Sequence, residues 1–357
     1  MGEKNSGEWK LQNDKFVLFR FVPTMRCNYR CKYCFLPHDM KKSAKETMFD
    51  LHSPAQWVDA MWNFSDYDVE LYAWGGEPFL LDGVYEVLRG WSRYSFVQPG
   101  NRIDTNVSFT DKIIAQCPTS KIKLNCSWHT QYDTFDSIFT KVKKLRAFDM
   151  VGMVNFVASP QNMDILSNKY RMSLDELVTR FANIDVYLNV AADFNLVHGD
   201  ADDPALTAYR QMILRHITRD EWALLHTPRK PGVCTAFRRF FTVYPNGDIS
   251  PCLFNKVVGN FFTGTLDNSH DDTCCEDCPS IVQYPFRLDN PYPYRQHFLE
   301  YVKRNKVHYY ETIQHETTMP AAPHDWQLIS SQLHRRLNVN ASLLERVTAR
   351  LNTTKHK

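Results

Sequence analysis

Cysteine is the residue type whose number and spacing in this 357-residue chain most clearly indicate chemistry. The chain has ten cysteines, of which three lie in the stretch Cys27-Asn-Tyr-Arg-Cys31-Lys-Tyr-Cys34 and five lie between residues 234 and 278. Disulfides rarely persist in a reducing cytosol, whereas thiolates bind zinc and the irons of iron–sulfur clusters. The two groups therefore predict two metal centres.

The first group offers three thiolates, and no further cysteine follows it before Cys117. Three thiolates in one short loop can bind three irons of a cubane cluster. A closed zinc site takes four ligands. His38 could supply the fourth ligand, so structural zinc remains the alternative at this loop.

The second group combines a predicted hairpin with a cysteine pair. Twelve residues separate Cys234 from Gly247, four separate Gly247 from Cys252, and the stretch Cys274-Cys275-Glu-Asp-Cys278 follows. The Asn-Gly pair that ends at Gly247 predicts a tight turn, which brings Cys234 and Cys252 towards one site. Four thiolates from the hairpin and the later pair can close around either zinc or an iron–sulfur cluster.

A framework of alternating strands and helices must position these cysteines. Six apolar stretches predict strands, and stretches with helical periodicity lie between them. This alternation predicts an α/β fold with a parallel sheet flanked by helices. No Gly-x-Gly-x-x-Gly follows the first strand, which argues against a Rossmann sheet. The six predicted strands cover residues 16–22, 69–74, 102–108, 121–128, 153–159 and 185–192.

The first cysteine group directly follows the first predicted strand, and in a β/α barrel that loop opens onto the face where active sites are built. The alternation stops near residue 226. Residues 240–250 then predict a β-hairpin, residues 284–294 are rich in proline and aromatic side chains, and apolar stripes between residues 326 and 351 predict C-terminal helices.

The Cys-x3-Cys-x2-Cys spacing, with Tyr33 before the last cysteine, resembles the signature of the radical S-adenosylmethionine (SAM) superfamily. The stretch Trp74-Gly75-Gly76-Glu77-Pro78, at the end of the second predicted strand, resembles that family's Gly-Gly-Glu-Pro motif. The resemblance implies a partial (β/α)6 TIM barrel and a [4Fe–4S] cluster with SAM bound to it. The implied cluster ligands are Cys27, Cys31 and Cys34.

The same resemblance implies a SAM site made from the ends of the strands. Gly75, Gly76, Glu77 and Pro78 would hold the amino group of the methionine part, and the backbone of Tyr33 would face the adenine. Asn106 and Ser127 fall where family members place ribose or carboxylate ligands. A strand-end cap or turn former is the alternative interpretation of these two residues.

The second cysteine group resembles the C-terminal extension of SPASM and Twitch radical SAM enzymes. No cysteine follows Cys278, so the shorter Twitch form with one auxiliary [4Fe–4S] cluster is expected. Its implied ligands are Cys234, Cys252, Cys275 and Cys278, and Cys274 could exchange roles with Cys275. The implied divisions are a polar lead-in (1–15), the partial barrel (16–225), a small Twitch-like iron–sulfur domain (226–282) and an aromatic-rich, helical C-terminus (283–357).

Two further residues are candidates for catalysis. His129 follows the fourth strand and is expected to contact substrate or act as a general base, although a hydrogen-bonded structural histidine is an equal alternative. Many members of the radical SAM superfamily, which this chain resembles, carry aspartate at the position of His129. Cys274 is a candidate hydrogen-atom donor, as is Cys126, and for both the alternative is a small buried residue.

The first hypothesis for function is therefore oxidation or epimerisation of a small polar molecule, such as a sugar, aminocyclitol or nucleoside, after reductive cleavage of SAM to a 5′-deoxyadenosyl radical. An external one-electron donor such as flavodoxin or ferredoxin would supply the electron. The second hypothesis is a maturase that modifies a ribosomally made peptide. Only about fifteen residues precede the first strand, which argues against an N-terminal peptide-recognition domain, although such a domain can also be a separate protein. The third is a non-enzymatic zinc-binding protein.

Composition limits the other classes of function. The net charge is +2, which gives no reason to expect binding to nucleic acid or to an anionic membrane. No stretch approaches the roughly 20 apolar residues that span a bilayer, and the N-terminus lacks the apolar segment of a secretory signal. A cytoplasmic protein is expected.

Overall fold

The computed structural model describes residues 15–34, 46–119, 121–191, 193, 209, 212, 239–251 and 256–267. Within these ranges ten strands form one sheet in the order β10-β9-β8-β7-β1-β2-β3-β4-β5-β6. Strands β1 to β6 are parallel, as the alternating pattern predicts. Their bounds are β1 Phe16–Phe21, β2 Asp68–Ala73, β3 Asn101–Thr105, β4 Ile122–Ser127, β5 Val151–Val157 and β6 Leu188–Ala191.

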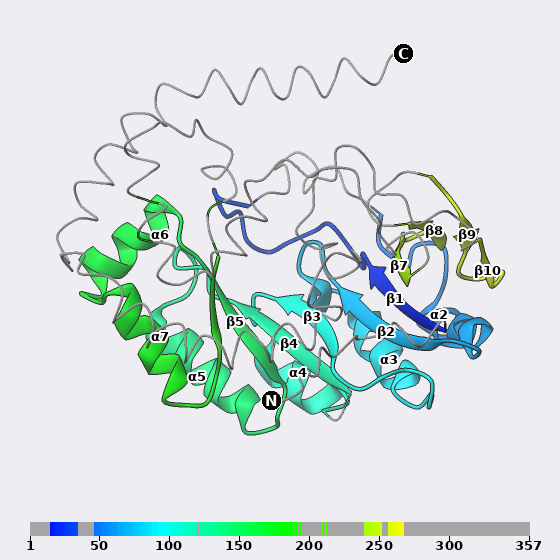
Figure 1. Cartoon of the computed structure of the whole chain (residues 1–357), viewed down its shortest axis with the longest axis horizontal. Coiled ribbons are helices and arrows are strands. Elements are labelled where there is room, and N and C mark those ends of the chain that lie inside the picture. Colours follow the sequence, from blue (N-terminus) through cyan, green and yellow to red (C-terminus); the bar gives the residue numbers. More distant parts are fainter. Residues whose placement is uncertain are drawn as a thin grey trace, which may run out of the picture.

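Helices follow the strands in the order expected of a partial (β/α)6 barrel and lie along one side of the sheet (Figure 1). Ser53, Thr134, Ser159 and Ser173 begin four of the helices, each accepting a backbone hydrogen bond at the first turn. The α-helices are α2 Pro54–Ala60, α3 Asp82–Trp91, α4 Thr110–Gln116, α5 Phe135–Arg146, α6 Pro160–Asp164 and α7 Leu174–Ala182. Two 3-10 helices, η1 Met61–Phe64 and η2 Pro78–Leu80, and one π-helix, η3 Ile165–Lys169, complete the helical segments of the described residues.

Two strands differ from their predicted bounds because of local backbone geometry. The third strand ends at Thr105 rather than at residue 108, since Val107 has a φ of 54°. The sixth begins at Leu188 rather than at residue 185, since Asp185 has a φ of 55°. Both values lie in the left-handed region, which extended strands do not adopt.

The two faces of the sheet carry different residues. Alternate strand residues such as Phe19, Leu71 and Leu124 join the helices in one buried apolar core. The residues between them face the other way, and many of these are polar, including Arg20, Asp104 and Asn125. We call these the helix-facing side and the inner side of the sheet. Burial of the apolar side is the main force that fixes the strand register.

The predicted hairpin forms and extends the barrel sheet. Strand β7 (Phe240–Val243) pairs antiparallel with β8 (Asp248–Pro251), and Gly247 in the turn has a φ of 86°. Strand β7 also pairs in parallel with β1. Two short strands, β9 (Gly259–Asn260) and β10 (Thr265–Leu266), continue the sheet. The predicted C-terminal helices lie outside the described residues.

No helix in the described part of the chain has both the length and the apolar character needed to cross a bilayer.

Candidate active site

The loop Cys27–Cys34 follows the carboxyl end of β1 after a connection of five residues, and the turn after β2 holds its beginning in place. Gly76 N–H donates to Thr24 O at 2.8 Å, and Glu77 N–H donates to Arg26 O at the same distance. The cysteine motif and the Gly-Gly-Glu-Pro motif, 50 residues apart in sequence, are thus joined by backbone hydrogen bonds. Cys31 is buried, and Cys27 and Cys34 are half-buried.

The two glycines of the second motif allow this close approach. A Cβ at Gly75 would lie 2.6 Å from Thr24 O, and a Cβ at Gly76 would lie 1.8 Å from Arg26 O. Gly75 also has a φ of 134°. The atoms nearest to these Cβ positions are carbonyl oxygens of the segment that leads into Cys27, so the absence of side chains lets the two motifs meet.

Glu77 connects the ends of β2 and β3. Its side chain is 1% exposed. Its carboxylate accepts hydrogen bonds from Asn106 N–H at 2.7 Å, the Thr105 hydroxyl at 2.9 Å and Phe79 N–H at 3.2 Å. Burial raises the pKa of Glu77 to about 7, because the charged carboxylate loses its hydration. The three hydrogen bonds lower the pKa by a smaller amount, and the nearby charge of Asp104 raises it further.

Asn106 connects the end of β3 to the cysteine loop. Its Nδ2 donates to Asn28 Oδ1 at 2.7 Å and lies 3.9 Å from Cys27 Sγ. Asn28 Nδ2 in turn donates to the Ser108 hydroxyl at 2.9 Å. The predicted SAM ligand Asn106 therefore lies beside the predicted cluster ligand Cys27, at the same edge of the sheet.

His129 meets the far end of the same loop. Its Nδ1 lies 2.7 Å from the Tyr33 hydroxyl and 3.1 Å from Cys31 Sγ. The rings of His129 and Tyr33 are stacked with centroids 6.0 Å apart. Ser127 ends β4 two residues earlier and is half-buried. The structure thus places His129 in contact with two loop residues that the resemblance assigns to the cluster and to SAM.

An aromatic contact that sequence analysis missed also holds the loop. Tyr29 stacks on Tyr132 with ring centroids 4.3 Å apart, and the Tyr132 hydroxyl accepts the N–H of Arg30 at 2.7 Å. Tyr29 OH accepts a hydrogen bond from Ser108 at 3.1 Å. No spacing rule connects position 29 with position 132. The only sequence signal is that Tyr132 follows the fourth strand, as other site residues follow theirs.

The donor set of the loop fits the irons of a cluster, because it supplies three soft thiolates within eight residues at the carboxyl edge of a parallel sheet. Among the described residues, no three His, Cys, Asp or Glu side chains are arranged around a point that would suit a single metal ion. His38 and the second cysteine group (Cys234, Cys252, Cys274, Cys275 and Cys278) lie outside the described residues. The auxiliary site therefore stays a prediction.

Cys126 lies away from this edge. It is fully buried on the helix-facing side of β4, and its Sγ lies 3.8 Å from Leu124 O. Burial raises the pKa of the Cys126 thiol well above its usual range. Of the two interpretations considered for Cys126, its position fits the small buried residue.

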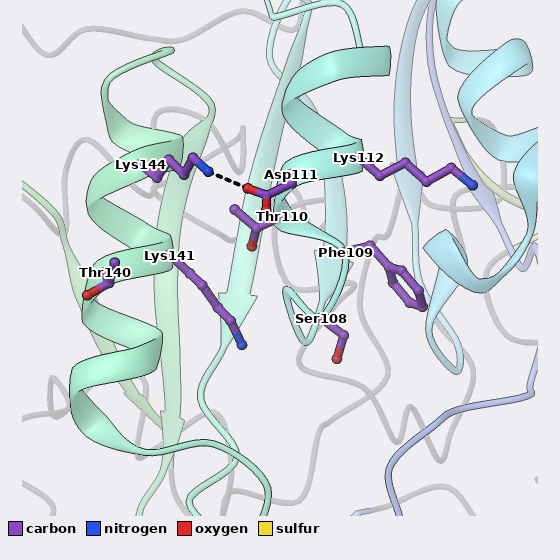
Figure 2. Close-up of a pocket in the computed structure, with 8 residues that line it drawn as sticks. All are labelled: Ser108, Phe109, Thr110, Asp111, Lys112, Thr140, Lys141 and Lys144. Atoms are coloured by element: carbon purple, nitrogen blue, oxygen red, sulfur yellow. Dashed lines mark hydrogen bonds and ion pairs between the residues drawn. The ribbon is translucent and has the colours of Figure 1, made fainter.

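A separate cavity of about 430 Å³ opens between α4 and α5, beside Ser108. Figure 2 shows Lys144 reaching Asp111 across the gap between the two helices. Lys141 pairs with Asp133 at 2.5 Å, and Lys112 pairs with Asp82 at 2.5 Å. Each lysine of the lining is thus paired with a carboxylate, and we assign this cavity no ligand.

Comparisons with known proteins give structural similarity alone. No protein-family model matches the chain, and no curated protein matches it. The solved structure of anSMEcpe with bound AdoMet is 15% identical, with a TM-score of 0.46 over 83% of this chain and 99% of that chain. SuiB of Streptococcus suis, bound to S-adenosylmethionine, is 16% identical, with a TM-score of 0.44 over 70% of this chain and 62% of that chain.

BtrN in complex with AdoMet and 2-DOIA is 15% identical, with a TM-score of 0.34 over 69% of this chain and 78% of that chain. Values in this range support no transfer of residue roles or activity.

Proposed function

We propose that this chain is a radical SAM enzyme in which Cys27, Cys31 and Cys34 hold a [4Fe–4S] cluster. One observation carries the proposal. The backbone hydrogen bonds from Gly76 and Glu77 join the second motif to the segment that leads into Cys27. Two motifs that resemble the same family, and that are distant in sequence, therefore meet at the edge of the sheet where active sites of β/α folds are built.

When bound, such a cluster would supply the electron for reductive cleavage of SAM, the chemistry that would start hydrogen abstraction from the substrate. The residues of this chain hold and orient the reactants. Three thiolates leave one iron of a cubane without a protein ligand, and that iron is where SAM would bind.

The strand ends around the loop provide the rest of the proposed SAM site. Glu77 would attract the ammonium of the methionine part, because Oε2 accepts one hydrogen bond and a carboxylate oxygen can accept two. The Tyr33 backbone would face the adenine, and Asn106 and Ser127 would bind the ribose or the carboxylate. Gly75, Gly76 and Pro78 would form, with Glu77, the strand-end turn that holds this amino group.

His129 has a positioning role in this proposal. Its Nδ1 contacts both Tyr33 and Cys31, so the ring holds the loop against the end of β4. The substrate in this proposal is a small polar molecule that undergoes oxidation or epimerisation. The second cysteine group would hold one auxiliary [4Fe–4S] cluster, and a soluble one-electron donor would reduce the enzyme.

Cysteine substitution with metal and product analysis tests the proposal. We expect anaerobically purified protein to contain iron and acid-labile sulfide, and to form 5′-deoxyadenosine from SAM when dithionite is added. Replacing Cys27, Cys31 and Cys34 with alanine should abolish 5′-deoxyadenosine. Replacing Cys234 and Cys252 should remove roughly half of the iron, because one of two cubane clusters is lost.

Cys117→Ala serves as the matched control, because Cys117 is a buried cysteine outside both groups. It should keep the iron and the SAM cleavage of the unmodified protein. Zinc without sulfide in the purified protein would instead support the zinc-binding hypothesis and end the enzyme proposal. Persistent 5′-deoxyadenosine formation in the triple variant would refute the assignment of the three ligands.

A further inference from the structure

The inner side of the sheet is polar where a β/α barrel usually has branched apolar residues. Neighbouring strands place polar residues side by side by register, as with Arg20 and Tyr72, Asp104 and Asn125, and Asn155 and Asn189. We call these six residues the inner polar row. Burying polar groups costs free energy unless each finds a partner, so such a row needs an explanation.

Side-chain hydrogen bonds connect much of the row. Asp104 accepts from the Tyr72 hydroxyl at 2.5 Å and from Asn125 Nδ2 at 2.7 Å. Further along the sheet, Asn189 Nδ2 donates to Asn155 Oδ1 at 2.9 Å. Asn125 is fully buried, while Asp104 on β3 and Asn155 on β5 are half-buried.

One acceptor in this row has no partner among the described residues. Asn125 Oδ1 is buried and receives no hydrogen bond from them. Rotating the amide by 180° would not give Oδ1 a partner. Oδ1 would then face the Asp104 carboxylate, which repels it, and Nδ2 would no longer donate to Asp104. The orientation of the amide is therefore determined by Asp104. A buried acceptor without a partner costs about 1–3 kcal/mol.

The position of Asn125 relates this acceptor to the proposed reaction site. Asp104 lies two residues before Asn106, and Asn125 lies two residues before Ser127. Two residues of a strand span about 7 Å. Asp104 and Asn125 therefore lie about 7 Å further into the barrel than the proposed SAM ligands on the same strands. Gly152 on β5 is the residue next to Asn125 Oδ1 and has no side chain. A Cβ at position 152 would lie 3.3 Å from that oxygen.

We propose that Asn125 and Asp104 bind a hydrogen-bond donor group, a hydroxyl or an amine, of the substrate. Asn125 Oδ1 accepts from that group, and the Asp104 carboxylate, held by Tyr72, lies beside it. The inference rests on the proposed function, since it assumes that a substrate is bound inside the barrel. The inference also narrows the substrate class to molecules that present a hydrogen-bond donor, rather than a carboxylate or a phosphate, to Asn125 and Asp104.

Binding of defined probes to the iron-loaded protein, with SAM and without reductant, tests this inference. The probes are myo-inositol for hydroxyl donors, glucosamine for an amine donor, and hexa-O-methyl-myo-inositol, which has the same ring without donors. We expect calorimetry to detect binding of at least one of the first two and none of the third. The better of the first two shows which donor the pair prefers.

Two variants examine the acceptor separately. Asn125→Leu removes Oδ1. Gly152→Ala places a methyl group beside Oδ1 and leaves the hydrogen bond between Asn125 and Asp104 in place. Each should weaken probe binding about tenfold, the effect of losing one buried hydrogen bond of about 1.4 kcal/mol. The control is Asn63→Leu, which removes an exposed amide on η1 that donates to the Phe261 and Phe262 carbonyls. It should bind the probes as the unmodified protein does.

Equal binding of the methylated probe, no binding of either donor probe, or unchanged binding in Gly152→Ala would each overturn the inference. Gly152→Ala keeps it testable if Asn125→Leu does not fold. Protein that contains iron and sulfide and cleaves SAM, but does not distinguish the probes, contradicts this inference alone. Protein without iron and sulfide contradicts the proposed function instead.

Discussion

At the scale of single residues, Glu77 shows how burial and hydrogen bonding compete. A carboxylate that accepts three hydrogen bonds would ordinarily have a low pKa. Glu77 is 1% exposed, and the loss of hydration outweighs the three donors, so its pKa rises to about 7 from an ordinary 4.5. Its protonation state near neutral pH is therefore sensitive to whatever approaches Oε2, and a cationic group there would favour the carboxylate.

The pH dependence of stability checks this pKa. Because the folded-state pKa of Glu77 is above its unfolded value, its contribution is fully present below about pH 4.5 and is lost as the pH rises through about 7. The metal-free protein should therefore lose about 3 kcal/mol of unfolding free energy from this group between pH 5 and pH 8. Urea unfolding at several pH values measures the slope.

Glu77→Gln should flatten that slope. Glutamine also presents an NH₂ group to the donors around position 77, so the variant is expected to be less stable at every pH, and the comparison concerns slopes alone. An equal slope in the variant would show that Glu77 titrates near its ordinary pKa.

At the scale of elements, the turn after β2 positions the cysteine loop more than any helix does. The turn can bond the segment before Cys27 only because residues 75 and 76 lack side chains. The ends of β3 and β4 then hold the rest of the loop through Asn106 and His129. Three strand ends thus fix eight residues that have little regular structure of their own.

Gly76→Ala should therefore damage both the fold and the site. The new methyl group would overlap Arg26 O, which lies 1.8 Å from the ideal Cβ position, and one of the two backbones must move. We expect a loss of at least about 2 kcal/mol in unfolding free energy, with a clear drop in bound iron. Urea unfolding and iron analysis measure the two effects.

Gly152→Ala is the matched control for stability and iron, because its Cβ would have no neighbour closer than 3.3 Å. It should change the unfolding free energy by less than about 1 kcal/mol and keep its iron. Equal effects of the two substitutions would mean that the contact with Arg26 does not position the loop.

At the scale of the whole molecule, the hairpin after residue 239 completes the sheet beside β1. Arg20 on β1 is buried, donates to the Thr242 hydroxyl on β7 at 2.6 Å, and lies 4.8 Å from the Trp74 ring. Phe261, which follows β9, packs its ring edge-on against Phe19 and Phe21. Residues more than 200 positions apart in the chain thus share one core with the strand that leads into the cysteine loop.

Thr242→Val tests this connection, since valine has the shape of threonine without the hydroxyl. Removing one partner of a buried guanidinium should cost about 1–3 kcal/mol of unfolding free energy, which urea unfolding measures. Thr242→Ser keeps a hydroxyl and should recover most of the loss. Equal stability of the valine and serine variants would show that the bond to Arg20 contributes little.

The amino-acid sequence alone determined the local features. Apolar stretches separated by helical periodicity predicted six parallel strands, and the Asn-Gly pair predicted the turn of the hairpin, because both signals lie within short segments of the chain. The tertiary structure decided which strand ends meet. It placed β7 beside β1, His129 against Cys31 and Tyr33, and Tyr132 against Tyr29. These contacts join residues about 100 to 220 positions apart, and their partners depend on strand order and side-chain packing, which no short-range pattern encodes.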